Sequence, residues 1–129
     1  GVQVAASAAP SAGDSGNVTV TLTNRGSKCA LNGFPAVDLD GGKTSAVPAD
    51  KAAKAQKLTL AKGATASFTI TYVRGAAGGA KSLPVKTAKF TLPGSSAGHS
   101  FKWTYGEVAV KGSAGAANAS VSPFQQAGD

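Results

Sequence analysis

The 129-residue sequence has one histidine, one cysteine and no methionine, and this scarcity limits the chemistry that it can carry. One cysteine cannot form an internal disulfide bond. Cys29 and His99 are too small a set for a zinc site without several carboxylates. A blue-copper site takes two histidines, a cysteine and usually a methionine, so it is excluded as well. We therefore expect no metal and no cofactor.

Groups suited to catalysis are equally scarce. A Ser-His-Asp triad would have to use His99, which lies in a Gly- and Ser-rich stretch where a lone histidine is usually exposed. The sequence has no G-x-S-x-G elbow, no P-loop and no dinucleotide fingerprint. Asp38 and Asp40, the acidic residues closest in sequence, are expected on the solvent face of a strand. We therefore expect that the protein is not an enzyme.

Long hydrophobic runs are missing too. No stretch approaches the roughly 20 apolar residues of a membrane-spanning helix, so no transmembrane segment is expected. The length fits a single domain, and the 17 glycines indicate many turns. We expect a flexible or edge-strand N-terminal segment over 1–16, one domain over 17–125 and a disordered tail over 126–129.

Acidic residues are few beside basic ones: 13 Lys and Arg stand against 6 Asp and Glu, a formal net charge of +7. Such an excess serves solubility or an anionic partner. Nucleic-acid sites usually rely on arginine forks and stacking aromatics, and arginine is scarce here, which argues against a nucleic-acid partner. The densest basic patch is Lys51, Lys54 and Lys57. It would lie on at most one short helical turn near 49–57, or on a solvated loop.

The sequence is rich in period-2 alternation of apolar and polar residues, which is typical of half-buried strands. The clearest runs are 18–23 and 66–73, and weaker ones occur at 2–4, 37–40, 88–92, 101–105, 108–110 and 119–124. Turn-forming Gly, Pro, Asn and Ser separate them. Together they predict an all-β fold, an immunoglobulin-like antiparallel β-sandwich of about seven to nine strands. The aromatic residues of 101–105 fit a core face better than a sugar-stacking strip.

One block of the sequence resembles a known family. The residues Asn24-Arg25-Gly26-Ser27, then Cys29, then Leu31-Asn32-Gly33-Phe34-Pro35 are similar to the first signature of the DUF4232 family. Segments 60–66, 92–94 and 121–124 resemble its later motifs, with Lys62 where proline is usual. The resemblance covers nearly the whole chain from Val18 onward.

This resemblance implies an immunoglobulin-like sandwich and a secreted protein or lipoprotein of actinobacteria, with no established biochemical function and no catalytic residues. Typical members of the family carry further cysteines, one of them in the loop that corresponds to 75–82, where this chain has none. Cys29 is therefore a candidate free thiol, although burial or an intermolecular bridge are also compatible with the sequence.

Taken together, these features favour a secreted, extracellular, non-catalytic binding or interaction module associated with the cell envelope. Its partner would be an anionic cell-wall polymer or a secreted protein. The alternative is a proteinaceous inhibitor or effector that binds another secreted protein through an exposed loop, at 41–57 or 75–82. The sequence leaves the oligomeric state open.

Overall fold

The computed structural model describes residues 2–24, 26, 28–41, 44–50, 54, 57–76, 79, 82–92, 98–111 and 116–126. In this part of the chain all regular secondary structure is β-strand, and every pair of named strands is antiparallel. The expected all-β antiparallel sandwich is therefore confirmed. No helix in these residues is long and apolar enough to cross a membrane.

The first sheet is built around two long strands, β2 (Ser15–Thr23) and β7 (Thr65–Val73). They pair over nine residues, from Ser15 opposite Val73 to Thr23 opposite Thr65. Buried and more exposed residues alternate along both strands, as the sequence pattern predicts. The sheet order is β1-β2-β7-β13, and β14 also pairs with β7; these outer strands are β1 (Val2–Ser7), β13 (Ala119–Val121) and β14 (Gln125–Gln126).

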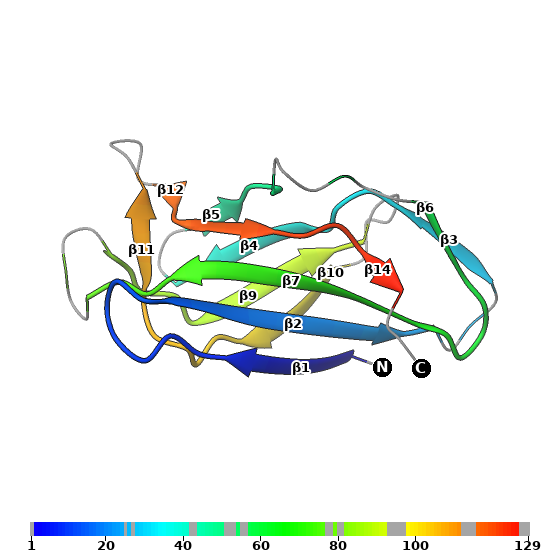
Figure 1. Ribbon diagram of the computed structural model, residues 1–129, viewed down its shortest axis with the longest axis horizontal. Helices are drawn as coiled ribbons and strands as arrows, with labels where there is room; N and C mark the ends of the chain where they lie inside the picture. Colours follow the sequence, from blue (N-terminus) through cyan, green and yellow to red (C-terminus); the bar gives the residue numbers. More distant parts are fainter. Residues whose placement is uncertain are drawn as a thin grey trace.

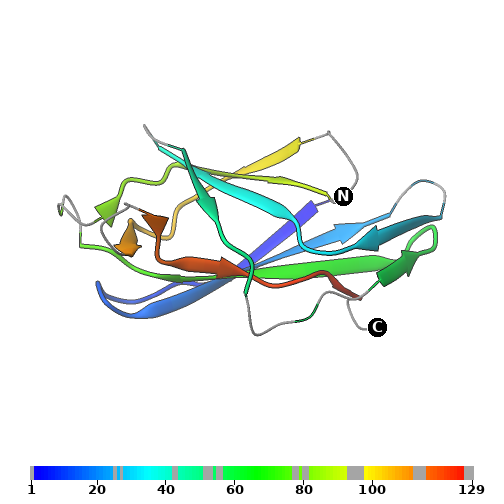
Figure 2. The same cartoon turned by 90° about the horizontal axis from the view of Figure 1, so that it is seen from above.

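The second sheet packs over the first, and Figure 2 shows the two layers nearly edge-on. Its order is β10-β9-β4-β5, with bounds β10 (Gly98–Lys102), β9 (Thr87–Thr91), β4 (Ala36–Asp40) and β5 (Thr44–Val47). A parallel bridge between Ala49 and Val121 links the chain that follows β5 to the first sheet. This bridge connects the two layers along one side of the sandwich.

Two small sheets occupy opposite ends of the sandwich (Figure 1). One end holds β3 (Cys29–Asn32) and β6 (Lys57–Leu60), and the other holds β8 (Ser82–Leu83), β11 (Val108–Lys111) and β12 (Ala116–Ala117). The described strand segments number fourteen, more than the seven to nine expected. Some of these segments are parts of one interrupted strand. For example, β13 and β14 both pair with β7, and Ser122-Pro123-Phe124 separates them.

Apolar side chains from both layers fill the space between the sheets. Phe68 of β7 packs edge-to-face on Phe90 of the second sheet, with ring centroids 5.2 Å apart, and on Phe124, at 5.4 Å. Trp103 is only 4% exposed, with its ring 5.0 Å from Tyr72 and 4.9 Å from Tyr105. The aromatic residues of the 101–105 run therefore form a core face.

The two ends of the described chain lie on one row of the first sheet. Val2 is paired with Leu22, Leu22 with Ala66, and Ala66 with Gln126. Gln126, the first residue of the expected tail, thus belongs to β14, and 127–129 lie outside the described residues. In Figure 1 the start of β1 and the end of β14 lie toward the same end of the molecule.

The segment expected to hold a helical turn is described only in part. Ala49 forms the bridge to Val121, and the Asp50 amide donates to the Val121 carbonyl at 2.9 Å. Lys57 is the first residue of β6. The described residues of 49–57 are therefore not helical, and 51–53 and 55–56 lie outside the described part.

Candidate functional site

The end of the sandwich formed by β3 and β6 has one buried face and one solvent face. Asn32 pairs with Lys57, and Cys29 pairs with Leu60. Leu31 and Leu60 are 5% and 3% exposed and belong to the core, whereas Lys57 and Thr59 are exposed. The alternation of a strand therefore anchors this pair through its leucines and presents its polar residues to solvent.

Asn24 fixes this end of the molecule to the rest of the sheet. Its side-chain amide donates to the Leu60 carbonyl at 2.9 Å, and its side-chain oxygen accepts from the Gly26 amide at 3.1 Å. Its backbone carbonyl accepts from the Gly63 amide at 2.6 Å. Gly63 has φ +86°, a left-handed conformation that glycine adopts without strain. Asn24 and Gly63 together hold the end of β2 against the turn that follows β6.

Exposed lysines decorate this end. Lys28 precedes β3, Lys57 begins β6, Lys62 lies in the turn after β6, and Lys54 lies shortly before β6. All four side chains are exposed, and none forms an ion pair with a described residue. We refer to β3, β6 and these four lysines as the basic arm.

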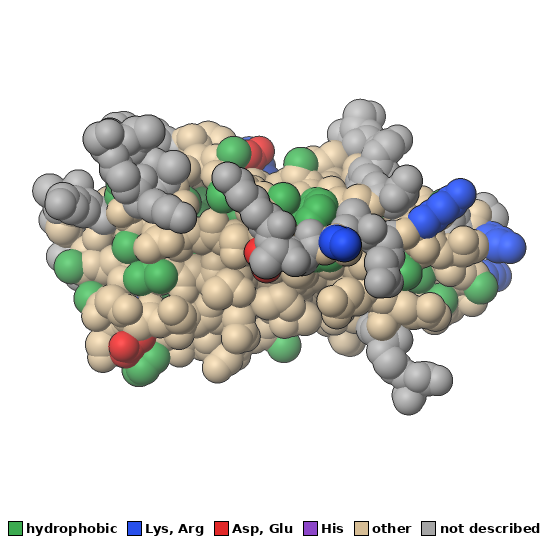
Figure 3. Space-filling model, turned by 45° about the horizontal axis from the view of Figure 1, so that its top comes forward, with side chains coloured by type: hydrophobic (Ala, Val, Ile, Leu, Met, Phe, Trp, Pro, Cys, Tyr) green, Lys and Arg blue, Asp and Glu red, His purple; other side chains and the backbone are tan. Residues whose placement is uncertain are grey.

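The pairing of β3 with β6 brings together two stretches of the sequence that contain no acidic residue. The sequence has no Asp or Glu in 15–37 or in 51–106, and the fold brings β3 from the first stretch beside β6 from the second. In Figure 3 most of the blue side chains lie at the end where β3 and β6 lie in Figure 1, and one lies nearer the middle of that face. The red side chains lie away from that end. The basic arm is thus a patch of one sign of charge.

The structure places part of the sequence-predicted patch in this arm. Lys54 and Lys57 belong to it, and Lys51 lies outside the described residues. Lys57 is in a strand, so the spacing of a helical turn does not apply to it. Sequence reasoning missed Lys28 and Lys62. Their signal was the long acid-free stretches, but only the pairing of β3 with β6 unites them.

Acidic side chains in the described part of the chain lie outside β3 and β6. The one nearest to the arm in sequence is Asp50, shortly before Lys54, and the Asp50 amide donates to the Val121 carbonyl. On the second sheet, Asp40 pairs with Lys89 at 3.6 Å, with both side chains well exposed, and such pairs contribute little to stability. Asp14 and Glu107 lie beside Arg74 at the opposite end of the sandwich. The Arg74 amide donates to the Asp14 carbonyl, and the Gly75 amide donates to the Glu107 carbonyl.

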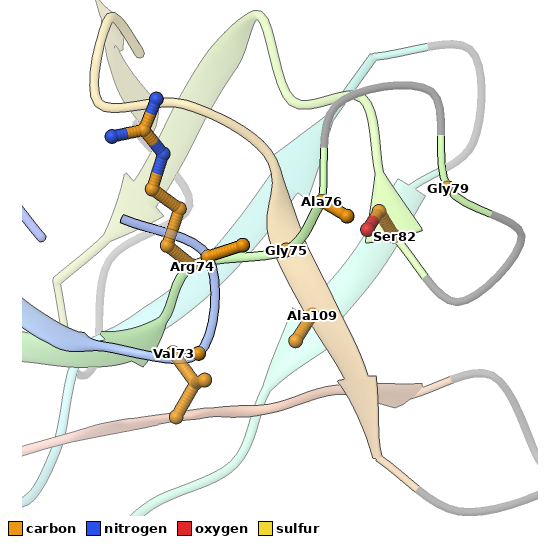
Figure 4. Close-up of a pocket in the computed structure, with 9 residues that line it drawn as sticks. Val73, Arg74, Gly75, Ala76, Gly79, Ser82 and Ala109 are labelled. Carbon is orange, nitrogen blue, oxygen red and sulfur yellow. The ribbon is translucent and has the colours of Figure 1, made fainter. Parts of the chain in front are cut away.

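An open depression of about 530 Å³ lies at that opposite end, beside the 75–82 loop (Figure 4). Small side chains and glycines line most of it, and the Ser82 hydroxyl is a polar group at its wall. The Arg74 side chain extends away from Ser82, and its guanidinium donates to the carbonyls of Ala9 (2.9 Å) and Pro10 (3.1 Å). The guanidinium therefore fixes the loop before β2 rather than facing into the depression.

The same end holds a pair of hydrogen-bonded tyrosines, Tyr72 and Tyr105. The Tyr72 hydroxyl accepts from the Ala9 amide at 3.1 Å and donates to the Tyr105 carbonyl at 3.3 Å. Burial, and then the neighbouring Tyr72 phenol, raises the pKa of Tyr105 above its usual 10.0. Tyr105 therefore stays neutral at physiological pH, and this cluster has a structural role.

Comparison with known proteins places the chain in a family. The sequence profile described as "Domain of unknown function (DUF4232)" matches residues 1–125. The chain belongs to this family. No curated protein and no solved structure matches it.

The DUF4232 signature residues can now be given structural roles. Asn24 bonds the turn after β6, and Gly33 adopts φ +113°, which favours glycine. The carbonyl of Gly33 accepts a long 3.5 Å bond from the Phe124 amide, and Pro35 is buried before β4. The signature therefore builds the base of the basic arm. The backbone of Cys29 lies in β3, but its side chain is outside the described part, so the free thiol remains a prediction.

Proposed function

We propose that this DUF4232 domain is a secreted, non-catalytic binding module whose basic arm binds an anionic polymer of the cell envelope. The observation that supports this proposal is the charge distribution. Four exposed lysines are gathered by two strands from stretches that contain no acidic residue. The resemblance of the chain to secreted actinobacterial proteins supports the extracellular location.

A repeating polyanion suits the chemistry of this surface. Lysine ammonium groups are compact point charges on flexible stems, and they do not need the planar geometry that an arginine fork imposes on its partner. Several lysines on one rigid end can engage successive charges of a polymer at once. Because all four are exposed, the attraction is screened by salt, and binding should weaken steeply as ionic strength rises.

The experiment is co-sedimentation of the purified protein with actinobacterial cell-wall material at two salt concentrations. Charges are weakly screened at about 50 mM salt and strongly screened at about 500 mM. We expect binding at the lower salt and its loss at the higher one. Replacing Lys28, Lys57 and Lys62 by glutamine should reduce the low-salt affinity at least about tenfold, since a surface lysine close to a polyanion contributes roughly 1 kcal/mol.

A matched control removes the same charge elsewhere. Lys86, Lys89 and Lys102 are exposed on the second sheet or next to it, and their replacement by glutamine also lowers the net charge of +7 by three. This control should retain most of the binding. Equal losses in the two triple variants would mean that only overall charge matters, and absence of binding already at the lower salt would refute the proposed partner.

The alternative function, inhibition of another secreted protein, draws support from the depression beside the 75–82 loop. Its small side chains leave room for an apolar side chain of a partner. Stoichiometric binding of one culture-supernatant protein that persists at high salt, and that Ser82→Trp abolishes, would favour this alternative.

A further inference from the structure

A second cavity, of about 410 Å³, lies at the base of the basic arm, between β6 and β14. Its volume falls within the range of small-ligand sites, roughly 300–1,000 Å³. It is lined by Lys54, Leu58, Pro123, Phe124, Gln125 and Gln126. Residues far apart in sequence thus converge next to the lysines of the arm.

The floor of this cavity is rigid, because the chain between β13 and β14 is fixed by a side chain. Pro123 has no amide hydrogen to donate to a strand ladder. The Ser122 hydroxyl takes the place of a strand carbonyl by accepting from the Thr69 amide at 2.8 Å, and the Ser122 amide donates to the Thr69 carbonyl at 2.9 Å. Phe124 is 1% exposed and packs against Phe68. The floor of the cavity is therefore held by backbone hydrogen bonds and by a ring buried in the core.

The rim of the cavity is polar and has spare hydrogen-bonding capacity. Lys54, Gln125 and Gln126 are all exposed. Neither glutamine side chain hydrogen-bonds to a described residue, and each carboxamide offers an acceptor oxygen and a two-proton donor. Leu58 is half-buried and contributes apolar surface beside them. The cavity thus combines an apolar wall, neutral polar groups and one cation.

The geometry points to a saccharide subsite: the cavity holds one acidic sugar residue of the polymer that the basic arm binds. The ring packs on Leu58 and Pro123. Its hydroxyls exchange hydrogen bonds with the carboxamide of Gln126, a residue that pairs with the core residue Ala66. Its anionic group faces Lys54. This inference rests on the proposed function and adds the chemical class of the repeating unit.

A peptide fits the same cavity less well. Peptides that add to a sheet need an exposed edge several residues long, and β14 has only two residues. Pro123 next to it offers no amide hydrogen. A carboxamide that carries both a donor and an acceptor matches the hydroxyls of a sugar better than a peptide that needs a long strand edge.

The test compares three polyanions by titration at about 50 mM salt, where screening is weak: polygalacturonate, inorganic polyphosphate and poly-glutamate. We expect Gln126→Ala to weaken polygalacturonate binding about five- to tenfold, the loss of roughly one hydrogen bond, and to leave polyphosphate binding unchanged. Gln125→Ala, on the opposite face of β14, should change neither. Gln3→Ala removes an exposed carboxamide from β1, away from the cavity, and should change neither.

The possible outcomes separate the two proposals. If polyphosphate and polygalacturonate bind with the same affinity and Gln126→Ala behaves like the wild type, the saccharide subsite is wrong and the polyanion-binding function stands. A preference for poly-glutamate that depends on Gln126 would overturn the saccharide in favour of a peptide. If no polyanion binds, the proposed function fails, and the subsite fails with it.

Discussion

The central β2–β7 pair and the basic arm have the same antiparallel backbone geometry and opposite roles. Val18, Val20 and Ile70 in the central pair are 0% exposed, and the pairing extends over nine residues. The β3–β6 pair is four residues long; Lys57 lies on its solvent side, and Lys28 and Lys62 flank its strands. The comparison indicates that stability is concentrated in the centre, which leaves the composition of the arm available for binding.

The largest effect should come from the centre. Phe68→Ala removes the ring that contacts both Phe90 and Phe124, and loss of a buried phenylalanine costs about 3–5 kcal/mol. Lys57→Ala in the arm should change the unfolding free energy by less than about 0.5 kcal/mol, because its side chain is exposed. Urea denaturation measures both values. Similar costs for the two variants would contradict the division of roles.

An intermediate effect is expected where the arm joins the sheet. Asn24→Ala removes the bonds to the Leu60 carbonyl and the Gly26 amide and should cost about 1–3 kcal/mol. Amide hydrogen exchange should quicken in β3 and β6 and stay slow in β2 and β7.

The matched control for that variant is Asn17→Ala, since Asn17 is an exposed asparagine in β2. It should leave exchange in the arm unchanged. Uniformly faster exchange throughout the Asn24→Ala protein would show that the arm and the centre unfold as one unit.

The smallest effect concerns the end opposite the arm. Since burial raises the pKa of Tyr105, the unfolded chain loses this proton first as pH climbs past 10.0. The stabilising contribution is therefore complete below that pH and is lost as pH rises through the folded-state pKa. The unfolding free energy should fall between about pH 8 and about pH 11 by more in the wild type than in Tyr105→Phe. Equal falls would assign the alkaline loss to other groups.

Sequence reasoning succeeded where one strand carries its own pattern. The 18–23 and 66–73 runs alternate strictly because one face of each strand is buried, and they correspond to β2 and β7. It failed where pairing is non-local. Cys29–Asn32 is too short to show alternation. The strand predicted over 119–124 is interrupted because the Ser122 hydroxyl accepts the bond from the Thr69 amide and Pro123 has no amide hydrogen to donate.

The candidate site was only partly predictable for the same reason. Lys54 and Lys57 are neighbours in sequence and could be found by counting charges. Lys28 lies some thirty residues away in the chain, and only the register of Cys29 with Leu60 brings it to the same end. The cavity at the base of the arm involves Leu58 and Gln125, whose proximity no local pattern encodes.

The row of residues from Val2 through Leu22 and Ala66 to Gln126 makes this chain topologically close to a ring. Val2 and Gln126 are three strand spacings apart, roughly 14 Å, which a short flexible linker can span. A circularly permuted chain opened at a surface turn would keep every register described above. Only the sequence separation between paired strands would change, and with it the entropy of loop closure and the rate of folding.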